Sequence, residues 1–272
     1  FINERAHANI QKDGTFSVVP QMKGGVTNPS ELRRIADVAD KYAIPMVKVT
    51  GGQRIDLLGV KKEDLVGVWS DLGMKSGHAY GKSIRTVKTC VGSEFCRFGT
   101  QNSTQMGIDL ETMLANMWSP HKVKLAVSGC PRNCAESGIK DVGIIAVDSG
   151  WEIHVGGNGG IKTEVARFLC KVKTADEVKE YTGAFLQLYR EEAYYLDRTV
   201  HYLERVGLDY VKQKVVEDAD SRRALYERLQ FALEGLPDPW AARIAGTQAR
   251  EYAPLKLAQP HPDRQIAVTL ED

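Results

Sequence analysis

The sequence lacks the long apolar runs and the basic excess that mark membrane-spanning and nucleic-acid-binding chains. Its 272 residues include 36 Lys and Arg against 35 Asp and Glu, which gives a formal net charge of +1. A nearly neutral chain is a poor general binder of nucleic acid or anionic surfaces. No apolar run approaches the length that spans a bilayer, and no signal peptide opens the chain. We therefore expect a cytoplasmic protein with neither a membrane nor a nucleic-acid partner.

Cysteine is scarce, and where it occurs it is clustered. Four of the five cysteines form two pairs, with five residues between Cys90 and Cys96 and three between Cys130 and Cys134. This clustering suits a reducing compartment and a metal better than a disulfide framework. An iron–sulfur cubane requires four thiolates, one for each corner iron. Zinc sites favour spacings of about two to four residues, so a zinc staple is the weaker alternative.

The second cysteine pair carries signs of a helix start. Pro131 follows Cys130 directly, and proline favours the first helical position. We therefore expect Cys130 to cap a short helix and Cys134 to lie one turn further on, with both sulfurs on one side. The exposed amides of a helix start favour negative charge, and a thiolate-bound cluster is negative. The fifth cysteine, Cys170, is expected to pack in the core.

Hydrophobic periodicity and turn residues predict an α+β chain without internal repeats. Strands are expected at 15–20, 46–49, 54–58, 123–127, 141–147 and 152–155, and helices at 29–42, 65–72, 110–118, 163–172 and 174–206, with more helix to about 236. Helix starts are marked by Asn28-Pro29 and by the capping box from Thr174 to Glu177. The glycine run at 156–160 lacks the spacing of a dinucleotide site. We divide the chain into 1–75, 76–210 and 211–272.

Basic side chains surround the cysteine pairs in the sequence. They are Arg54, Arg85, Lys122 and Lys124. Taken singly, each is most simply a solvated charge. Lys122 and Lys124, however, share one face of a predicted strand whose other face is apolar and which leads into Cys130. Basic groups that converge near a metal suit a small anion, whose charge they attract and whose departing oxygens they help to protonate. His78, in a glycine-rich joint at 73–81, is either a further ligand or simply polar.

These residues resemble those of the nitrite and sulfite reductases that contain sirohaem and a [4Fe–4S] cluster. Both cysteine pairs match the family signature, and the four basic residues match its substrate-binding positions. Residues 76–104, SGHAYGKSIRTVKTCVGSEFCRFGTQNST, are similar to the C-terminal catalytic part of the large subunits of NAD(P)H-dependent assimilatory nitrite reductases. The resemblance covers roughly residues 1–210, and the C-terminal helices match more loosely.

The resemblance implies a fold and a chemistry. A small ferredoxin-like half domain, 1–75, would precede a sirohaem and [4Fe–4S] α+β domain, 76–210, and a helical extension, 211–272. All four cysteines would hold the cluster, and Cys134 would also ligate the sirohaem iron. The basic set would bind nitrite and assist its protonation during six-electron reduction to ammonium. Donors to the sirohaem carboxylates are expected from Arg97, Arg132, Asn133, Gly156 and Gly157.

The chain departs from the family in two respects. It has no flavin or nicotinamide fingerprint and begins at Phe1, so we expect a fragment of a longer polypeptide. FAD and NAD(P)H are expected on an electron-input domain or small subunit outside it. Tandem members of the family contain two copies of this unit and this chain has one, so we expect a homodimer. A sulfite reductase and a haem-free iron–sulfur electron carrier remain open as alternatives.

The first prediction concerns the cysteines. Cys134→Ser is expected to disturb both cofactors, because one thiolate would serve the cluster and the sirohaem iron. Cys170→Ser, the matched control, is expected to leave the visible absorption spectrum and the iron content nearly unchanged. Loss of iron from the Cys170 variant would show that the four ligands are wrongly assigned.

Overall fold

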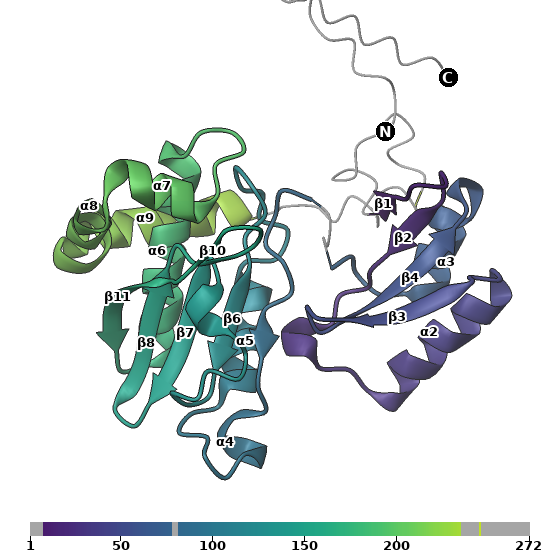
Figure 1. Cartoon of the computed structure of the whole chain (residues 1–272), viewed down its shortest axis with the longest axis horizontal. Helices are drawn as coiled ribbons and strands as arrows, with labels where there is room; N and C mark the ends of the chain where they lie inside the picture. Colours follow the sequence, from purple (N-terminus) through teal and green to yellow (C-terminus); the bar gives the residue numbers. More distant parts are fainter. Residues whose placement is uncertain (1–7, 78–80, 235–244, 246–272) are drawn as a thin grey trace, which may run out of the picture.

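Two separate sheets, each with its own hydrophobic core, organise the chain (Figure 1). The computed structural model describes residues 8–77, 81–234 and 245. The first sheet has four strands in the order β1-β2-β4-β3. The elements of this unit are β1 (Ala8–Ile10), β2 (Phe16–Val18), η1 (Lys23–Gly25), α2 (Pro29–Lys41), β3 (Met46–Thr50), β4 (Arg54–Val60), η2 (Lys62–Asp64) and α3 (Leu65–Leu72).

Local sequence explains most of this first unit. Asn28 caps α2, since its side-chain oxygen accepts from the backbone N–H groups of Ser30 and Glu31 at 3.0 Å each. Helix α3 ends at Gly73, which adopts a left-handed conformation with φ of 56°. Both helices pack on the sheet through a core that includes Leu57, Val68, Trp69 and Leu72. The predicted helices at 29–42 and 65–72 are thus confirmed to within a residue or so.

The second sheet has five strands in the order β11-β8-β7-β6-β5. Its strands are β5 (Lys88–Thr89), β6 (Leu125–Ser128), β7 (Val142–Val147), β8 (Gly150–Val155) and β11 (Arg167–Val172), with a separate small ribbon of β9 (Asn158–Gly159) and β10 (Thr163–Glu164). Strands β5, β6 and β7 run parallel, whereas β8 and β11 pair antiparallel. The predicted hairpin at 141–155 is confirmed as β7 and β8.

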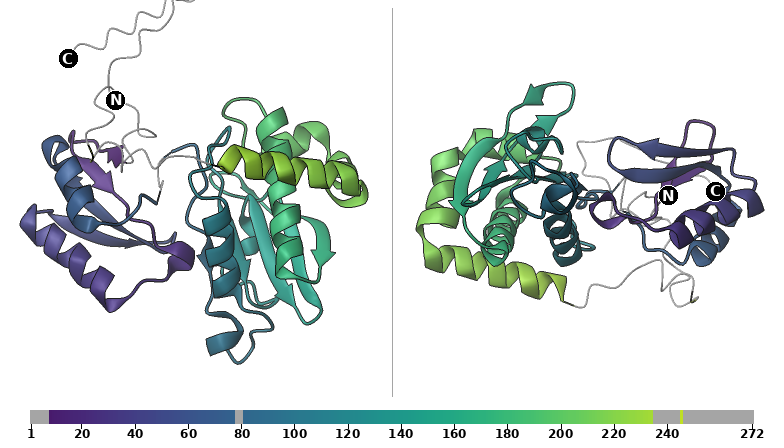
Figure 2. Two further views of the ribbon diagram at one scale, coloured as in Figure 1. Left: turned by 180° about the vertical axis from the view of Figure 1, so that it is seen from behind. Right: turned by 90° about the horizontal axis from the view of Figure 1, so that it is seen from below.

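Helices cover one face of this sheet (Figure 2). The helical elements of this unit are α4 (Gly92–Phe95), α5 (Ser103–Met113), α6 (Ala175–Glu192), α7 (Thr199–Val206), α8 (Leu208–Lys212), the π-helical segment η4 (Gln213–Glu217) and α9 (Ala219–Leu233), with η3 (Ser137–Ile139) in a loop. The capping box of α6 is present as predicted. Residues Val211, Val215, Leu225 and Leu229 belong to the core beneath α6, so 211–233 pack as part of this unit. No helix within the described ranges is both long and apolar enough to span a membrane.

The structure corrects several predicted elements. Residues 163–172 form strands rather than a helix. The strand pattern is hidden in the sequence because a bulge between Phe168 and Cys170 buries both Leu169 and Cys170 and breaks the alternation of a regular strand. Cys170 packs in the core as expected, and burial raises the pKa of its thiol to about 12. The helix predicted at 110–118 instead spans Ser103–Met113, because Asn102 caps its start, and Trp118 lies beyond it in an isolated β-bridge with Ser83.

Two further predictions need adjustment. The predicted helix at 174–206 is interrupted between α6 and α7, where Leu196 has φ of 74° and donates its N–H to the Pro120 carbonyl. The segment around Cys130 contains turns instead of a helix start. The candidate ligand His78 and the tail beyond Glu234, apart from Ala245, lie outside the described residues.

A buried carboxylate joins the two units. Glu111 of α5 accepts hydrogen bonds at Oε2 from the N–H groups of Gly24 and Val87, each at 3.0 Å, and at Oε1 from Gln21 Nε2 at 3.3 Å. Burial raises the pKa of this carboxyl from 4.5 to about 7, although the same hydrogen bonds oppose the shift. Glu111 therefore links η1 of the first unit to the strand approach of the second.

Glu111 predicts a pH-dependent stability. The pKa of Glu111 is about 7 in the folded chain and 4.5 in the unfolded chain. Protonation of this carboxyl therefore stabilises the folded state, and the stabilisation is complete below pH 4.5. That contribution, about 3 kcal/mol, is lost as pH rises toward 7. Glu111→Gln is expected to remove it, because an amide does not titrate and Gln21 can turn its own amide to remain paired. Urea unfolding at pH 5 and pH 8 measures how the free energy of unfolding changes between the two pH values. An equal change for wild type and variant would contradict the prediction.

Candidate active site

The cysteine pairs meet at one edge of the second sheet. Cys90 directly follows β5, and Cys130 follows β6 with one residue between. Because β5 and β6 are parallel neighbours, their carboxyl ends lie together. The backbone N–H of Gly129 donates to Cys90 Sγ at 3.1 Å, and Ser103 Oγ lies 3.2 Å from the same sulfur. Sheet topology thus brings Cys130 near Cys90, from which it is 40 residues away in sequence.

The donors around Cys90 favour a thiolate. Burial by itself would raise the pKa of this thiol, but hydrogen bonds from Ser103 and from the backbone of Gly129 and Gly92 outweigh burial and lower the pKa. Cys130 is buried, Cys96 is half-buried and Cys134 is exposed. The last of these is therefore accessible to a group bound outside the loop.

Left-handed turns shape the loop that carries Cys130 and Cys134. Asn133 and Glu136 have φ of 57° and 60°, and the N–H of Glu136 donates to the Asn133 carbonyl. The predicted helix cap at Cys130 is wrong for this reason. The side chain of Asn133 closes the loop, since its Oδ1 accepts from Ser128 Oγ at 3.2 Å and from the Gly138 N–H at 3.3 Å.

The arrangement of the cysteines suits a polynuclear cluster better than a single ion. Within the described residues, no three His, Cys, Asp or Glu side chains are grouped as ligands of one metal ion. A tetrahedral zinc staple needs four such ligands about one centre. A cubane takes one thiolate at each of four corner irons, so its ligands stand further apart. Two loops supply two cysteines each, and the surroundings of Cys90 favour its thiolate. These cysteines fit the donor set of a cubane.

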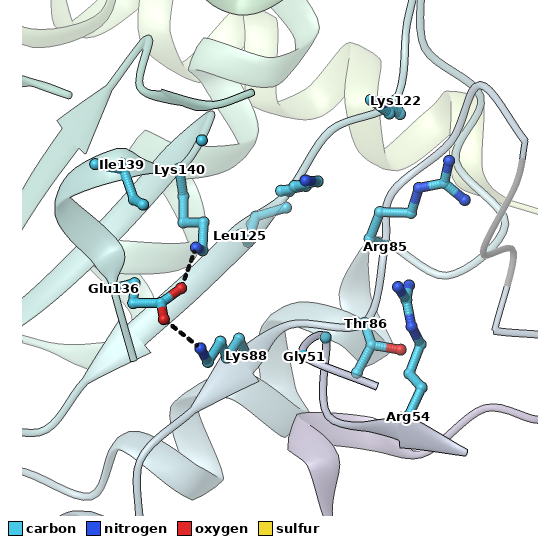
Figure 3. A pocket seen from close by; sticks show the side chains of 13 residues that line it. Gly51, Arg54, Arg85, Thr86, Lys88, Lys122, Leu125, Glu136, Ile139 and Lys140 are labelled. Carbon is cyan, nitrogen blue, oxygen red and sulfur yellow. Dashed lines mark hydrogen bonds and ion pairs between the residues drawn. The ribbon is translucent and has the colours of Figure 1, made fainter. Parts of the chain in front are cut away.

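A cationic cavity is lined by residues of both units (Figure 3). Its volume is about 410 Å³, and both units contribute to its walls. Six lining residues are basic and one is acidic: Arg54, Arg85, Lys88, Lys122, Lys124, Lys140 and Glu136. The structure therefore brings together all four basic residues that the sequence singled out. Such a charge balance selects an anion.

The two predicted anion-binding arginines are held by different segments. Arg54 opens β4 at the tip of the β3–β4 turn, and its guanidinium folds back over Gly52, where a Cβ would lie 2.7 Å from Arg54 Nη2. Arg85 is buried on the approach to β5, and its N–H donates to the Val123 carbonyl at 2.9 Å. Figure 3 shows Arg54 and Arg85 among the side chains that line this cavity.

The two lysines are poised to give up protons. Burial lowers the pKa of both ammonium groups, and the nearby charge of Arg198 lowers both further. Arg85 also lowers the pKa of Lys122, and Lys122 also lowers that of Lys124. A lysine with a lowered pKa is a better proton donor near neutral pH than an ordinary one. The cavity thus combines anion attraction with a source of protons.

A buried carboxylate supports the lysine segment from behind. Asp141 is fully buried and accepts from Arg198 Nη2 at 2.7 Å and from Thr199 Oγ1 at 2.6 Å. Its Oδ2 also accepts the backbone N–H of Lys124 at 2.8 Å. Through Asp141, the start of α7 fixes the position of Lys124. Replacing this hub would leave a buried cation unpaired, which is costly.

The residues predicted to bind sirohaem carboxylates have other partners. Arg97 and Arg132 both lie against the Phe98 ring, at 4.6 Å and 3.9 Å from its centre. The N–H groups of Gly156 and Gly157 donate to the carbonyls of Asp141 and Lys140, each at 2.9 Å. These two amides are therefore engaged within the chain, and the proposed contacts remain predictions.

Sequence reasoning missed three charged residues of the cavity. Glu136 bridges Lys88 at 3.1 Å and Lys140 at 3.0 Å (Figure 3). The signal for Lys88 was its place two residues before Cys90, on the strand that leads to this cysteine. For Glu136 and Lys140 only their spacing of four was visible, which in a turn-rich loop indicates little.

Comparison with known families assigns the chain. A model of the nitrite and sulphite reductase 4Fe-4S domain matches residues 80–223, and a model of the nitrite/sulfite reductase ferredoxin-like half domain matches residues 9–75. Together with the paired cysteines and the cationic cavity, these matches define the class: the chain belongs to the nitrite and sulfite reductase family. Its fold is accordingly the half domain joined to the 4Fe-4S domain.

Individual members of the family show which reductases the chain resembles in sequence. The chain is 63% identical over 240 residues to the NAD(P)H nitrite reductase of Bacillus subtilis, which covers 88% of this chain and 30% of that protein. It is 34% identical over 215 residues to an assimilatory-type sulfite reductase of Nitratidesulfovibrio vulgaris, which covers 79% of this chain and 99% of that protein. The chain therefore spans less than a third of the nitrite reductase that it matches.

Solved structures agree on the fold. The Mycobacterium tuberculosis NirA protein superposes with a TM-score of 0.60 and 20% identity, over 75% of this chain and 40% of that one. Dissimilatory sulfite reductase I superposes with a TM-score of 0.65 and 16% identity, over 92% of this chain and 73% of that one. At these identities the likeness concerns the fold alone.

Proposed function

We propose that this chain is the catalytic part of a sirohaem-dependent nitrite reductase that converts nitrite to ammonium with six electrons. The observation that carries the proposal is the cavity in which Arg54, Arg85, Lys122 and Lys124 converge, in a chain that also carries the two cysteine pairs. The 63% identity to a protein named NAD(P)H nitrite reductase selects nitrite as the substrate. When bound, sirohaem and the [4Fe–4S] cluster supply the electrons and the coordination of the substrate nitrogen.

The residues of the chain have distinct tasks in this proposal. The permanently charged guanidinium groups of Arg54 and Arg85 hold the anion in place. Lys122 and Lys124, with lowered pKa values, donate protons to the oxygens that leave as water. Cys90, Cys96, Cys130 and Cys134 hold the cluster, and exposed Cys134 is the thiolate that would also meet the sirohaem iron.

The polycarboxylate character of sirohaem fits the surroundings. Besides the four substrate-binding residues, the cavity contains Lys88 and Lys140, both in contact with Glu136. These two lysines are candidates for holding carboxylates of the macrocycle, alongside the earlier candidates Arg97 and Arg132. A haem-free electron carrier would have no use for so many converging cations.

Sulfite reduction is the second candidate function. The relative from N. vulgaris is named a sulfite reductase, and a single unit of this kind makes up 99% of it. Both substrates are small oxyanions, so the same basic set would bind either one. The ratio of kcat/KM for nitrite to that for sulfite separates the two functions.

Replacement of the lysines tests the proposed function. Lys122→Ala and Lys124→Ala are each expected to lower nitrite turnover by roughly 10²-fold, the typical loss for a positioned proton or anion donor. The cofactor absorption spectrum should not change, because neither lysine is a cluster ligand. The measurement is ammonium formation with a chemical electron donor. Wild-type turnover in both variants would remove these lysines from the active site.

We also propose a homodimer with composite sites. Lys124 directly precedes β6, and Cys130 lies six residues further on, which corresponds to roughly 20 Å of extended chain. A lysine side chain is much shorter than this. Two copies related by a twofold axis can place Lys122, Lys124 and Arg85 of one chain opposite the cysteines of its partner. In the alternative arrangement, a site within one chain, the turn that brings Glu136 back to the cavity would connect the cysteine loop to the lysines.

Complementation decides between the two arrangements. Mixing an inactive Cys134→Ser chain with an inactive Lys124→Ala chain is expected to form heterodimers in which one of two composite sites is intact. Recovered nitrite turnover, close to half of wild type per heterodimer, supports the proposal. Heterodimers that form without recovered activity would defeat it, as would full activity of a purified monomer.

The remaining assignments follow from the same relatives. We propose that electrons arrive from NAD(P)H through a flavin domain or a small subunit outside this chain, as the names of the relatives suggest. We further propose a cytoplasmic location and a role in nitrate assimilation. Co-purification with an NAD(P)H-oxidising flavoprotein would support this electron route.

A further inference from the structure

Gln53 connects the two units next to both parts of the candidate active site. Its Nε2 donates to the Thr89 carbonyl at 2.7 Å, and the Thr89 N–H donates to Gln53 Oε1 at 2.8 Å. Gln53 directly precedes Arg54, and Thr89 directly precedes Cys90. One side chain therefore ties the turn that carries an anion-binding arginine to the strand that leads to a cluster cysteine.

The backbone at Gln53 makes this residue an unusual choice. Its φ of 56° lies in the left-handed region, which glycine adopts freely and asparagine tolerates better than other residues. A glutamine there is strained, and strain that persists points to a role for the side chain. Asparagine has the same amide but is one methylene shorter. The extra length is what carries the Gln53 amide to Thr89.

The surroundings leave room for this contact. A Cβ on Gly25 would lie 2.7 Å from both Cβ and Oε1 of Gln53. A Cβ on Gly107 would lie 2.2 Å from Thr89 Cγ2. Thr89 is also fixed from its other side, because its Oγ1 donates to the Gly24 carbonyl at 2.6 Å. Glycines of both units thus clear the space in which the Gln53 amide meets the Thr89 backbone.

The contact acts on Arg54 through a short, braced turn. The Gln53 N–H donates to the Thr50 carbonyl at 3.1 Å, and Thr50 Oγ1 donates to the Arg54 carbonyl at 3.1 Å. The hydrogen bonds of Glu111 and Lys23, in contrast, attach η1, which carries none of the predicted anion-binding residues. Holding Gln53 therefore fixes where Arg54 begins relative to the second unit.

We propose that Gln53 is a positioning residue for substrate binding, which sets Arg54 against Arg85 and the lysines by docking the β3–β4 turn on Thr89. The inference rests on the proposed nitrite reduction and adds to it a residue that touches neither substrate nor cofactor. Gln53 holds the two units in one relative position and thereby keeps Arg54 in place in the anion site.

Gln53→Asn tests the proposal with the least disturbance of the turn. Asparagine suits the left-handed backbone but does not reach Thr89, so we expect KM for nitrite to rise about tenfold with kcat changed less than twofold. Gln53→Glu is a second variant, which accepts from the Thr89 N–H but has no donor for its carbonyl, and the same rise is expected. The matched control, Gln21→Asn, loses the inter-unit contact to Glu111 and should keep KM unchanged.

A double-mutant cycle shows whether Gln53 acts through Arg54. In an Arg54→Ala background, Gln53→Asn is expected to raise KM no further, because the group that it positions is gone. Equal effects of Gln53→Asn with and without Arg54 would overturn the proposal. An unchanged KM in both Gln53 variants would do so as well.

Amide hydrogen exchange tests the contact between Gln53 and Thr89 independently of nitrite turnover. In the purified holoprotein, Gln53→Asn is expected to speed amide exchange at 50–54 and at Thr89, while Gln21→Asn leaves both unchanged. Unaltered exchange at these positions would overturn the proposal. If wild type failed to reduce nitrite but the variant exchanged faster, the proposed function would fall, whereas the docking of the turn would stand.

Discussion

The parallel pairing of β5 with β6 is the constraint on which the rest of the site depends. It brings Cys90 and Cys130 to one edge of the sheet, although the strands come from distant parts of the sequence. The same pairing sets Arg85 and Lys124 near the opposite ends of these strands. The proposed cluster ligands and the proposed anion ligands therefore lie at opposite ends of the same two short strands. This separation is the physical basis for expecting a second copy at each site.

Charge is distributed unevenly in a chain that is almost neutral as a whole. The cavity gathers six basic residues about one carboxylate. Two buried acids hold neighbouring segments: Asp141 accepts from Arg198 and from the backbone of Lys124, and Glu111 accepts from the backbone at the junction between the units. Because these carboxylates accept backbone N–H groups, they fix the positions of the segments as well as their charge.

The sequence predicted elements best where local signals decide them. The caps at Asn28 and Thr174, the stop at Gly73 and the hairpin of β7 and β8 were all predictable from residues close in sequence. Predictions failed where distant contacts outweigh local preference. The bulge in β11 hides the strand period, and the contact of Leu196 with Pro120 accompanies the break in a helix that periodicity alone would continue. The turns after Cys130 likewise depend on the partners of Asn133.

The chemistry of the site was present in the sequence by itself, since the spacing of four cysteines and the identities of four basic residues indicate a metal cluster and an anion. Spacing can do this because ligand chemistry depends on residue type and short-range order. Only the tertiary structure decided that Arg54, from a different sheet, joins Arg85 and the lysines, and that Lys88, Glu136 and Lys140 complete the cavity. The reason is that these groups meet through strand pairing and the docking of two separate cores, which no local pattern records.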